Sequence, residues 1–297
     1  MDLFKDLQNS TVFCSDGAWG TELAKAGMEI GYCPELLNAE KPDVVKKVAG
    51  DYIQAGSQII LTNTFGGSPF KLARYGLQER TFELNKKGTE ISREAAGSEV
   101  LVFASLGPSG EFLEPYGTLG EKELTEGFAV QAEAFRQGGA DCVLVETMSD
   151  LRELICALHA VKESTDLPVV CSMTFEKGRN GYATMMGIKP GDAVKKIVEE
   201  GAEIPGANCG AGIDQMVEIA AIMHSAVQSP LWIKPNAGMP EIENGKTVFR
   251  ESPEYMASRV VQLIEAGAGI IGGCCGTTPA HLSAIRKEID KVNQQQS

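Results

Sequence analysis

The stretch Ala266-Gly267-Ala268-Gly269-Ile270-Ile271 joins the end of an amphipathic segment to a short apolar run. A glycine after a helix commonly takes the left-handed conformation, which glycine reaches without steric cost, and a short turn can then start a strand. The same junction recurs at Ala55-Gly56-Ser57-Gln58-Ile59-Ile60, Gly138-Gly139-Ala140-Asp141-Cys142-Val143 and Glu200-Gly201-Ala202-Glu203-Ile204. These junctions predict a repeated unit in which strands alternate with helices.

Short apolar runs along the chain have the composition of strands. They are continuous runs rich in Val, Ile and Leu, which is typical of parallel strands buried on both faces. The predicted strands are Val12–Ser15, Gln58–Thr62, Val100–Leu106, Cys142–Glu146, Val169–Thr174, Ile204–Asn208, Leu231–Lys234 and Ile270–Gly273. The glycine junctions precede every second strand, so the repeat extends over most of the chain.

Segments with helical periodicity lie between and after these strands. The predicted helices are Val44–Ala55, Leu84–Ala96, Glu121–Gln137, Leu151–Ser164, Gly191–Glu200, Ile213–Ser225, Pro253–Ala266 and Pro279–Val292. Eight strands, each followed by a helix, predict an α/β fold closed into a single (β/α)8 TIM barrel. We expect the barrel to occupy residues 1–292 and a polar tail to follow at 293–297.

Composition and charge narrow the range of functions. The chain has 297 residues, of which 43% are hydrophobic, enough for a full core. Its 40 acidic and 27 basic residues give a net charge of −13, which disfavours nucleic acid as a partner because phosphate binding needs a cationic surface. The acidic start Met1–Asp6 lacks the apolar region of a signal peptide, and no apolar run has the length of a membrane span. We therefore expect a cytoplasmic protein without a membrane partner.

Three cysteines follow the ends of predicted strands, where the chemistry of a (β/α)8 barrel is located. Cys209 follows the sixth strand, and Cys274 and Cys275 follow the eighth, with only the seventh strand between them. Three thiolates in this arrangement suit Zn²⁺, and three protein ligands with an open fourth position are typical of catalytic zinc. The histidines do not complete the set, because they fall within predicted helices: His159, His224 and His281. A lone cysteine is more often a packing residue, which is the interpretation for Cys14, Cys33, Cys142, Cys156 and Cys171.

Polar residues at the other strand ends predict a substrate for this metal. Asp16 and Glu146 end the first and fourth strands, across the barrel from the cysteines, and could hold a substrate ammonium group. The backbone N–H groups of Gly17 and Ala18 could hold a carboxylate. An amino acid with a terminal thiol would satisfy both ends of such a site. Asp16 could instead be a turn or helix-capping residue.

Further candidates border the same rim. Thr62 and Asn63 end the second strand and Ser105 lies near the end of the third, so we expect them to contact the substrate. Asn236 follows the seventh strand, between the cysteine-bearing strands, and its amide oxygen could fill the fourth zinc position until a thiol displaces it. The alternative for Asn236 is a turn residue in Pro-Asn-Ala-Gly.

Five motifs in order resemble signatures of the homocysteine S-methyltransferase family. They are Asp16-Gly17-Ala18-Trp19-Gly20-Thr21, Thr62-Asn63-Thr64-Phe65, Gly206-Ala207-Asn208-Cys209, Pro235-Asn236-Ala237-Gly238 and Gly272-Gly273-Cys274-Cys275-Gly276-Thr277-Thr278-Pro279. The chain is similar in particular to the homocysteine-binding module of cobalamin-dependent methionine synthase. Trp19 stands where that module usually has Met, and no folate or cobalamin module follows before Ser297.

The resemblance implies a zinc-dependent methyltransferase that converts homocysteine to methionine. It implies that Cys209, Cys274 and Cys275 hold Zn²⁺ and that the metal keeps the homocysteine sulfur deprotonated for attack on an activated methyl group. The expected donor is a methylcobamide carried by a separate corrinoid protein. Direct transfer from S-methylmethionine or betaine is the alternative, and a zinc protein that binds thiols without turnover, or whose zinc is structural, is a third interpretation.

Overall fold

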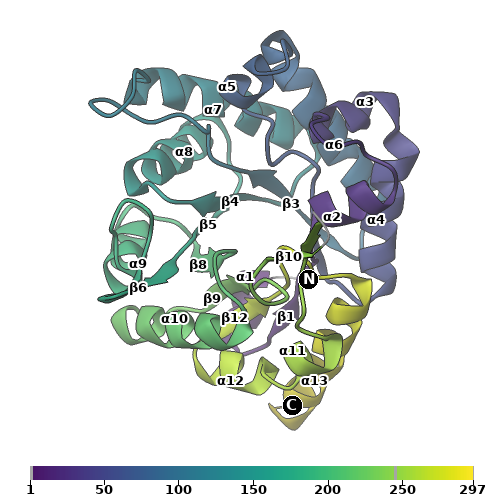
Figure 1. Ribbon diagram of the computed structural model, residues 1–297, viewed down its shortest axis with the longest axis vertical. Coiled ribbons are helices and arrows are strands. Elements are labelled where there is room, and N and C mark those ends of the chain that lie inside the picture. Colours follow the sequence, from purple (N-terminus) through teal and green to yellow (C-terminus); the bar gives the residue numbers. More distant parts are fainter. Residues whose placement is uncertain (1–2, 244–245, 297) are drawn as a thin grey trace.

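The computed structural model describes residues 3–243 and 246–296, and its central feature is a ring of eight parallel strands (Figure 1). The order around the sheet is β1-β12-β9-β8-β5-β4-β3-β2, and a parallel bridge between Ser15 and Ile59 joins β1 to β2. The strands are β1 (Phe13–Cys14), β2 (Ile59–Leu61), β3 (Leu101–Leu106), β4 (Cys142–Met148), β5 (Val169–Met173), β8 (Ile204–Asn208), β9 (Leu231–Lys234) and β12 (Ala268–Ile271). The predicted (β/α)8 barrel is confirmed.

Helices surround the ring of strands, as Figure 1 shows in a view along the axis of the barrel. The main ones are α4 (Pro42–Gln54), α6 (Thr81–Ala96), α7 (Glu121–Gly138), α8 (Leu151–Ser164), α9 (Pro190–Glu199), α10 (Ile213–Ala226), α11 (Pro253–Ala257), α12 (Val260–Glu265) and α13 (Pro279–Gln296). Short helices in the loops are α1 (Leu3–Gln8), α2 (Trp19–Lys25), α3 (Leu37–Glu40) and α5 (Pro69–Ala73), with 3₁₀ turns at Pro34–Leu36 and Gln78–Arg80. Two hairpins, β6 (Glu176–Gly178) with β7 (Gly181–Ala183) and β10 (Glu241–Glu243) with β11 (Lys246–Val248), extend the loops after β5 and β9.

The glycine junctions have the predicted backbone conformation. The φ angles are +103° at Gly56, +85° at Gly139, +88° at Gly201 and +96° at Gly267. At Gly139, for example, the N–H donates to Arg136 O and the following Ala140 N–H donates to Phe135 O, so the last helical carbonyls are satisfied as the chain turns into β4. Each junction thus ends one helix and starts the next strand.

The inside of the barrel is apolar at the end where the strands begin. Phe103 and Trp232 stack there with ring centroids 5.6 Å apart, and Leu3 and Leu7 of α1 belong to the same buried cluster. Helix α1 packs at the end of the barrel where the strands begin, and the polar residues at the carboxyl ends of the parallel strands lie at the opposite end. A second, larger cluster lies between the sheet and the helices.

Two predicted helices have different bounds. The single helix predicted at Pro253–Ala266 is divided into α11 and α12, because Arg259 N–H bonds to Met256 O in a turn. The helix predicted to end at Val292 continues to Gln296, and Asn293 exchanges hydrogen bonds of 3.0 and 2.9 Å with the backbone of Val12. The first residue assigned to the polar tail therefore packs against the barrel, whereas Ser297 lies outside the described residues.

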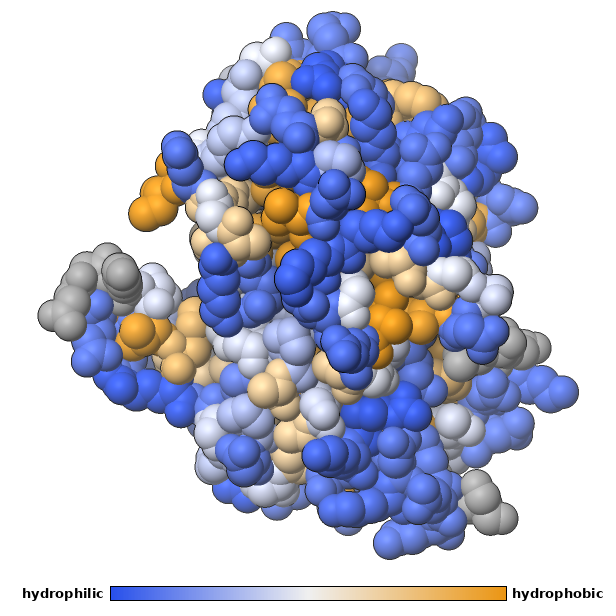
Figure 2. Space-filling model, turned by 90° about the vertical axis from the view of Figure 1, so that its right-hand side faces the viewer, coloured by the Kyte–Doolittle hydropathy of each residue, from blue (hydrophilic) through white to orange (hydrophobic). Residues whose placement is uncertain are grey.

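The surface seen from the side is mostly hydrophilic, with hydrophobic residues in small patches (Figure 2). Within residues 3–243 and 246–296, no helix combines the length and the hydropathy needed to cross a bilayer.

Candidate functional site

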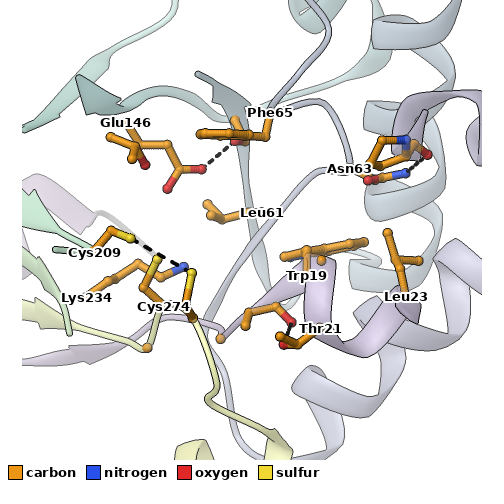
Figure 3. A pocket seen from close by; sticks show the side chains of 18 of the residues that line it. Trp19, Thr21, Leu23, Leu61, Asn63, Phe65, Glu146, Cys209, Lys234 and Cys274 are labelled. Atoms are coloured by element: carbon orange, nitrogen blue, oxygen red, sulfur yellow. Dashed lines mark hydrogen bonds between the residues drawn. The ribbon is translucent and has the colours of Figure 1, made fainter. Parts of the chain in front are cut away.

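A cavity of about 400 Å³ opens at the carboxyl ends of the strands. All of the residues predicted for the site line this cavity except Asp16 and Asn236. Figure 3 shows Cys209 and Cys274 on one side of the pocket, Glu146 above them, and Trp19 and Asn63 on the opposite side. The strand ends therefore bring together polar groups that lie more than 250 residues apart in the chain.

The three rim cysteines form one cluster. Their Sγ atoms all lie within 4.8 Å of one another, and Cys209 Sγ lies 3.9 Å from Cys275 Sγ. The end of β9 holds both cysteine-bearing loops, since Cys209 N–H donates to Lys234 O at 3.1 Å and Cys274 N–H donates to Pro235 O at 2.7 Å. Cys209 has a φ of +60°, a conformation that costs free energy in a non-glycine residue and commonly marks a functional constraint.

Hydrogen bonds within this cluster stabilise a negative charge on the sulfur of Cys209. Thiol groups of Cys274 and Cys275 stabilise the Cys209 thiolate and lower the pKa of Cys209 to about 3. The same charge raises the pKa of Cys275 to about 11 and that of Cys274 further. All eight cysteines are free thiols, and the other five are buried, where desolvation raises the pKa of each thiol. Among the eight cysteines, Cys209 alone has a lowered pKa.

Asn236 lies beside the cluster, behind the wall of the cavity. Its side chain is 4% exposed, and its Oδ1 has no hydrogen-bond partner among the described residues. A hydrogen bond from the Asn236 amide also contributes to the lowered pKa of Cys209. A buried amide oxygen without a donor is costly unless a ligand satisfies it.

Glu146 occupies the predicted position at the end of β4. The carboxyl group accepts a hydrogen bond from Ser105 Oγ at 2.5 Å, and burial raises the pKa of Glu146. The next residue, Thr147, has a φ of +61° and is held by the Asn208 side chain. The Asn208 amide accepts from Thr147 N–H at 2.9 Å and donates to Thr147 Oγ1 at 2.7 Å. Asn208 thus connects the Glu146 segment to the strand that carries Cys209.

Asp16 lies at the end of β1 and is held by hydrogen bonds within the protein. Its carboxylate is fully buried and paired with Lys234 Nζ at 2.6 Å. The other oxygen, Oδ2, accepts from Leu61 N–H and from Trp19 Nε1–H, each at 2.7 Å. Three protein donors already surround this carboxylate, and the contact of Asp16 with a substrate ammonium group stays a prediction.

Several of the other groups predicted to contact the substrate already form hydrogen bonds within the protein. Ala18 N–H donates to Thr277 Oγ1 at 3.2 Å, so a substrate carboxylate would compete with that hydroxyl. A Cβ at Gly17 would lie 2.8 Å from Tyr52 and Thr277, which explains the need for glycine there. Thr62 Oγ1 accepts from Ser105 N–H at 3.0 Å. The Asn63 amide donates to Pro34 O at 2.7 Å, so Asn63 borders the cavity while its donors bind the protein.

The sequence interpretation gave no role to two charged residues of the lining. Glu35 is buried, accepts from Gly66 N–H at 2.6 Å and has a pKa raised by burial. Lys234 is the charged residue at the end of an otherwise apolar strand, Leu-Trp-Ile-Lys. That pattern was the available signal, because a charge in a buried strand requires a partner. Glu35 lies in a loop with no comparable pattern.

Comparison with known proteins agrees with this architecture. The chain is 30% identical to a methionine synthase from Mycobacterium tuberculosis over 97% of its own length and 25% of that protein, and 29% identical to one from Mycobacterium leprae over 95% and 24%. It therefore spans about a quarter of these relatives. The crystal structure of the metallated homocysteine methyltransferase MmuM from Escherichia coli has the same fold, with a TM-score of 0.80 at 23% identity over 96% of this chain and 99% of that one. A family model described as homocysteine S-methyltransferase matches residues 13–289, so the chain belongs to the homocysteine S-methyltransferase family.

Proposed function

We propose that the protein is a zinc-dependent methyltransferase that converts homocysteine to methionine. The observation that carries the proposal is the cluster of Cys209, Cys274 and Cys275 sulfurs within 4.8 Å, in the wall of a cavity that also contains the buried Glu146. Family membership and the methionine synthases among the relatives support the acceptor.

The donor set fits a zinc ion. Three cysteine sulfurs are preferred zinc ligands, and the unsatisfied Oδ1 of Asn236 is an oxygen donor beside them. When bound, zinc lowers the pKa of a coordinated thiol and so supplies a sulfur nucleophile at neutral pH. Cys209, Cys274 and Cys275 would hold the ion, with Asn236 in the position that the acceptor thiol replaces. The MmuM structure in its metallated form is consistent with this assignment.

The residues of the chain orient the acceptor. Glu146, fixed by Ser105, would bind the homocysteine ammonium group, and that contact would hold the acceptor sulfur toward the cysteines. The apolar lining excludes water from the reacting sulfur. The sulfur then attacks the methyl carbon: a sulfur–carbon bond forms, the bond from the methyl group to its carrier breaks, and the thiol proton is released to solvent.

We propose a methylcobamide on a separate corrinoid protein as the donor, on the strength of the similarity to methionine synthases. Direct transfer from S-methylmethionine or betaine is the alternative. The cytoplasmic location also stays a prediction, supported by the requirement of free cysteine ligands for a reducing compartment.

Calorimetric titration of homocysteine into zinc-loaded protein tests the acceptor. Repeating the titration in buffers of different ionisation enthalpy counts the protons released, and we expect about one, because the bound sulfur is deprotonated. The Cys209→Ser variant is the matched control and should bind no homocysteine. Absence of homocysteine binding to the wild-type protein would refute the proposed acceptor.

Product assays then identify the donor. Methionine is measured after incubation with homocysteine and free methylcobalamin, S-methylmethionine or betaine, each supplied separately. Formation of methionine from S-methylmethionine or betaine alone would establish the alternative donor. Homocysteine binding without product from any donor, including a methylated corrinoid protein, would support a thiol-binding protein without turnover.

A further inference from the structure

The segment Phe249–Glu251 connects β11 to α11 (Figure 1) and has no part in the proposed transfer. It lies outside the lining of the cavity. It nevertheless contacts each of the three loops that follow β8, β9 and β12, which carry Cys209, Asn236 and the Cys274–Cys275 pair. One short segment therefore reaches every loop around the thiol cluster.

The half-buried side chain of Glu251 holds the loop after β8. Its Oε2 accepts a hydrogen bond of 3.3 Å from the N–H of Ile213, the first residue of α10. A Cβ at Gly212 would lie 2.7 Å from Oε1, so the carboxyl group packs directly on the Gly212 backbone. The start of the same loop is bonded to β9, because Cys209 N–H donates to Lys234 O. Glu251 thus fixes the far end of a loop that is only a few residues long.

The backbone of Glu251 is linked to the other two loops. Its N–H donates to Ala237 O at 3.1 Å, and Ala237 N–H donates in turn to Cys275 O at 3.0 Å. Its carbonyl oxygen lies 2.9 Å from Nε2 of the buried His281. Because a carbonyl oxygen can only accept, Nε2 carries the imidazole proton, and Nδ1 accepts from Thr278 N–H at 3.2 Å. Glu251 is therefore connected to the loop after β12 through Ala237 and through His281.

The ring of Phe249 packs on the loop after β12. Gly276, which follows Cys275, has a φ of +81°, and a Cβ at this position would overlap the Phe249 ring. The loops that carry the cysteines are thus held both by β9 and by Phe249–Glu251. Residues that hold metal ligands in place commonly raise metal affinity, because the ligands then need little reorganisation when the ion binds.

We propose that Glu251 is a positioning residue that sets the separation between Cys209 and the Cys274–Cys275 pair, so that the three sulfurs are placed for zinc before the ion binds. This inference rests on the proposed function and deepens it. Glu251 acts through backbone groups of the cysteine-bearing loops and not by contact with the ion. The requirement is an acceptor oxygen that reaches Ile213 N–H, and the negative charge is secondary.

Three substitutions separate the reach of the Glu251 side chain from its charge, and all of them keep the backbone hydrogen bonds. Zinc affinity is measured by competition with a chromophoric chelator. We expect Glu251→Ala to bind zinc roughly 10- to 100-fold more weakly than the wild type. Glu251→Asp keeps the charge but is one methylene shorter, so it should be weakened similarly. Glu251→Gln keeps the length and an acceptor oxygen, so it should bind zinc as tightly as the wild type.

Glu254→Ala is the matched control, because it removes the same charge from an exposed position in α11. It should keep the zinc affinity of the wild type. Tight binding by Glu251→Asp together with weak binding by Glu251→Gln would show that the charge acts, and would overturn the assignment.

The spectrum of the Co²⁺-substituted protein reports the arrangement of the sulfurs directly. We expect the d–d bands to shift in Glu251→Ala and Glu251→Asp and to stay unchanged in Glu251→Gln. A purely structural role would lower the urea midpoint of the metal-free variants and leave the zinc affinity and the Co²⁺ spectrum of the folded protein unchanged, which would also overturn the assignment.

The comparison of Glu251→Asp with Glu251→Gln decides the question if Glu251→Ala does not fold, since both retain a polar group beside Ile213. Equal zinc affinity in the wild type and in all Glu251 variants would refute the inference alone. A wild-type protein that binds no zinc would refute the proposed function, and the inference would fail with it.

Discussion

Replacing Asn208 with alanine removes the side chain that joins the Glu146 segment to the cysteine-bearing strand. The Asn208 side chain is fully buried and makes three hydrogen bonds of 2.9 Å or less, to Thr147 N–H, Thr147 Oγ1 and Ser172 Oγ. Its amide also points toward Cys274 Sγ at 3.9 Å. These contacts come from β4, β5 and the loop after β12.

The expected cost follows from these bonds. At about 1 kcal/mol each, three hydrogen bonds amount to about 3 kcal/mol of unfolding free energy. Ser172→Ala removes only one of them and should cost about 1 kcal/mol. Thr147→Gly also loses one bond but relieves the positive φ of +61°, so its two effects should nearly cancel.

Urea denaturation of the metal-free proteins measures these differences, and calorimetry measures homocysteine affinity after zinc loading. We expect Asn208→Ala to lose affinity as well as stability, because Thr147 no longer fixes the backbone beside Glu146. A stability loss in Asn208→Ala no greater than that in Ser172→Ala would refute the assignment of Asn208 as the connecting residue.

Three further predictions concern the metal site and the buried carboxyl group of Glu35. Cys274→Ser should abolish zinc retention after dialysis, measured by metal analysis, whereas Cys171→Ser, a buried packing cysteine, should keep zinc; equal retention would contradict the ligand assignment. Asn236→Ala should keep zinc but change the affinity for homocysteine, because homocysteine no longer has to displace an amide oxygen from the metal. Unchanged homocysteine affinity would refute Asn236 as a fourth ligand. Burial raises the pKa of Glu35, so the folded protein binds the Glu35 proton more tightly than the unfolded chain does. The protonated Glu35 therefore contributes to the free energy of unfolding below the ordinary pKa of a glutamic acid. This contribution is lost as the pH rises through the raised pKa. Glu35→Gln should therefore lose less stability than the wild type between acidic and neutral pH in urea titrations, and parallel curves would count against a raised Glu35 pKa.

The local patterns of the chain were sufficient for the barrel. Left-handed glycines at Gly56, Gly139, Gly201 and Gly267 lie where helix ends meet strand starts, because only a residue without Cβ makes that turn freely. Buried parallel strands need continuous apolar runs, and these are visible without any tertiary information. Since strand ends of a barrel share one rim, the meeting of Cys209 with Cys274 and Cys275 also followed from sequence order.

Only the tertiary structure decided that Lys234 lines the cavity whereas its partner Asp16 does not. Sequence order places Asp16 and Lys234 at strand ends with equal claim to the site, yet Asp16 is turned into the protein by Leu61, Trp19 and Lys234. A buried charge takes the partner that relieves its desolvation, and that partner is 218 residues away in the chain. The local sequence pattern therefore determined the ring of strands and the thiol cluster. The long-range pairing of Asp16 with Lys234 determined which of these two charged side chains lines the cavity.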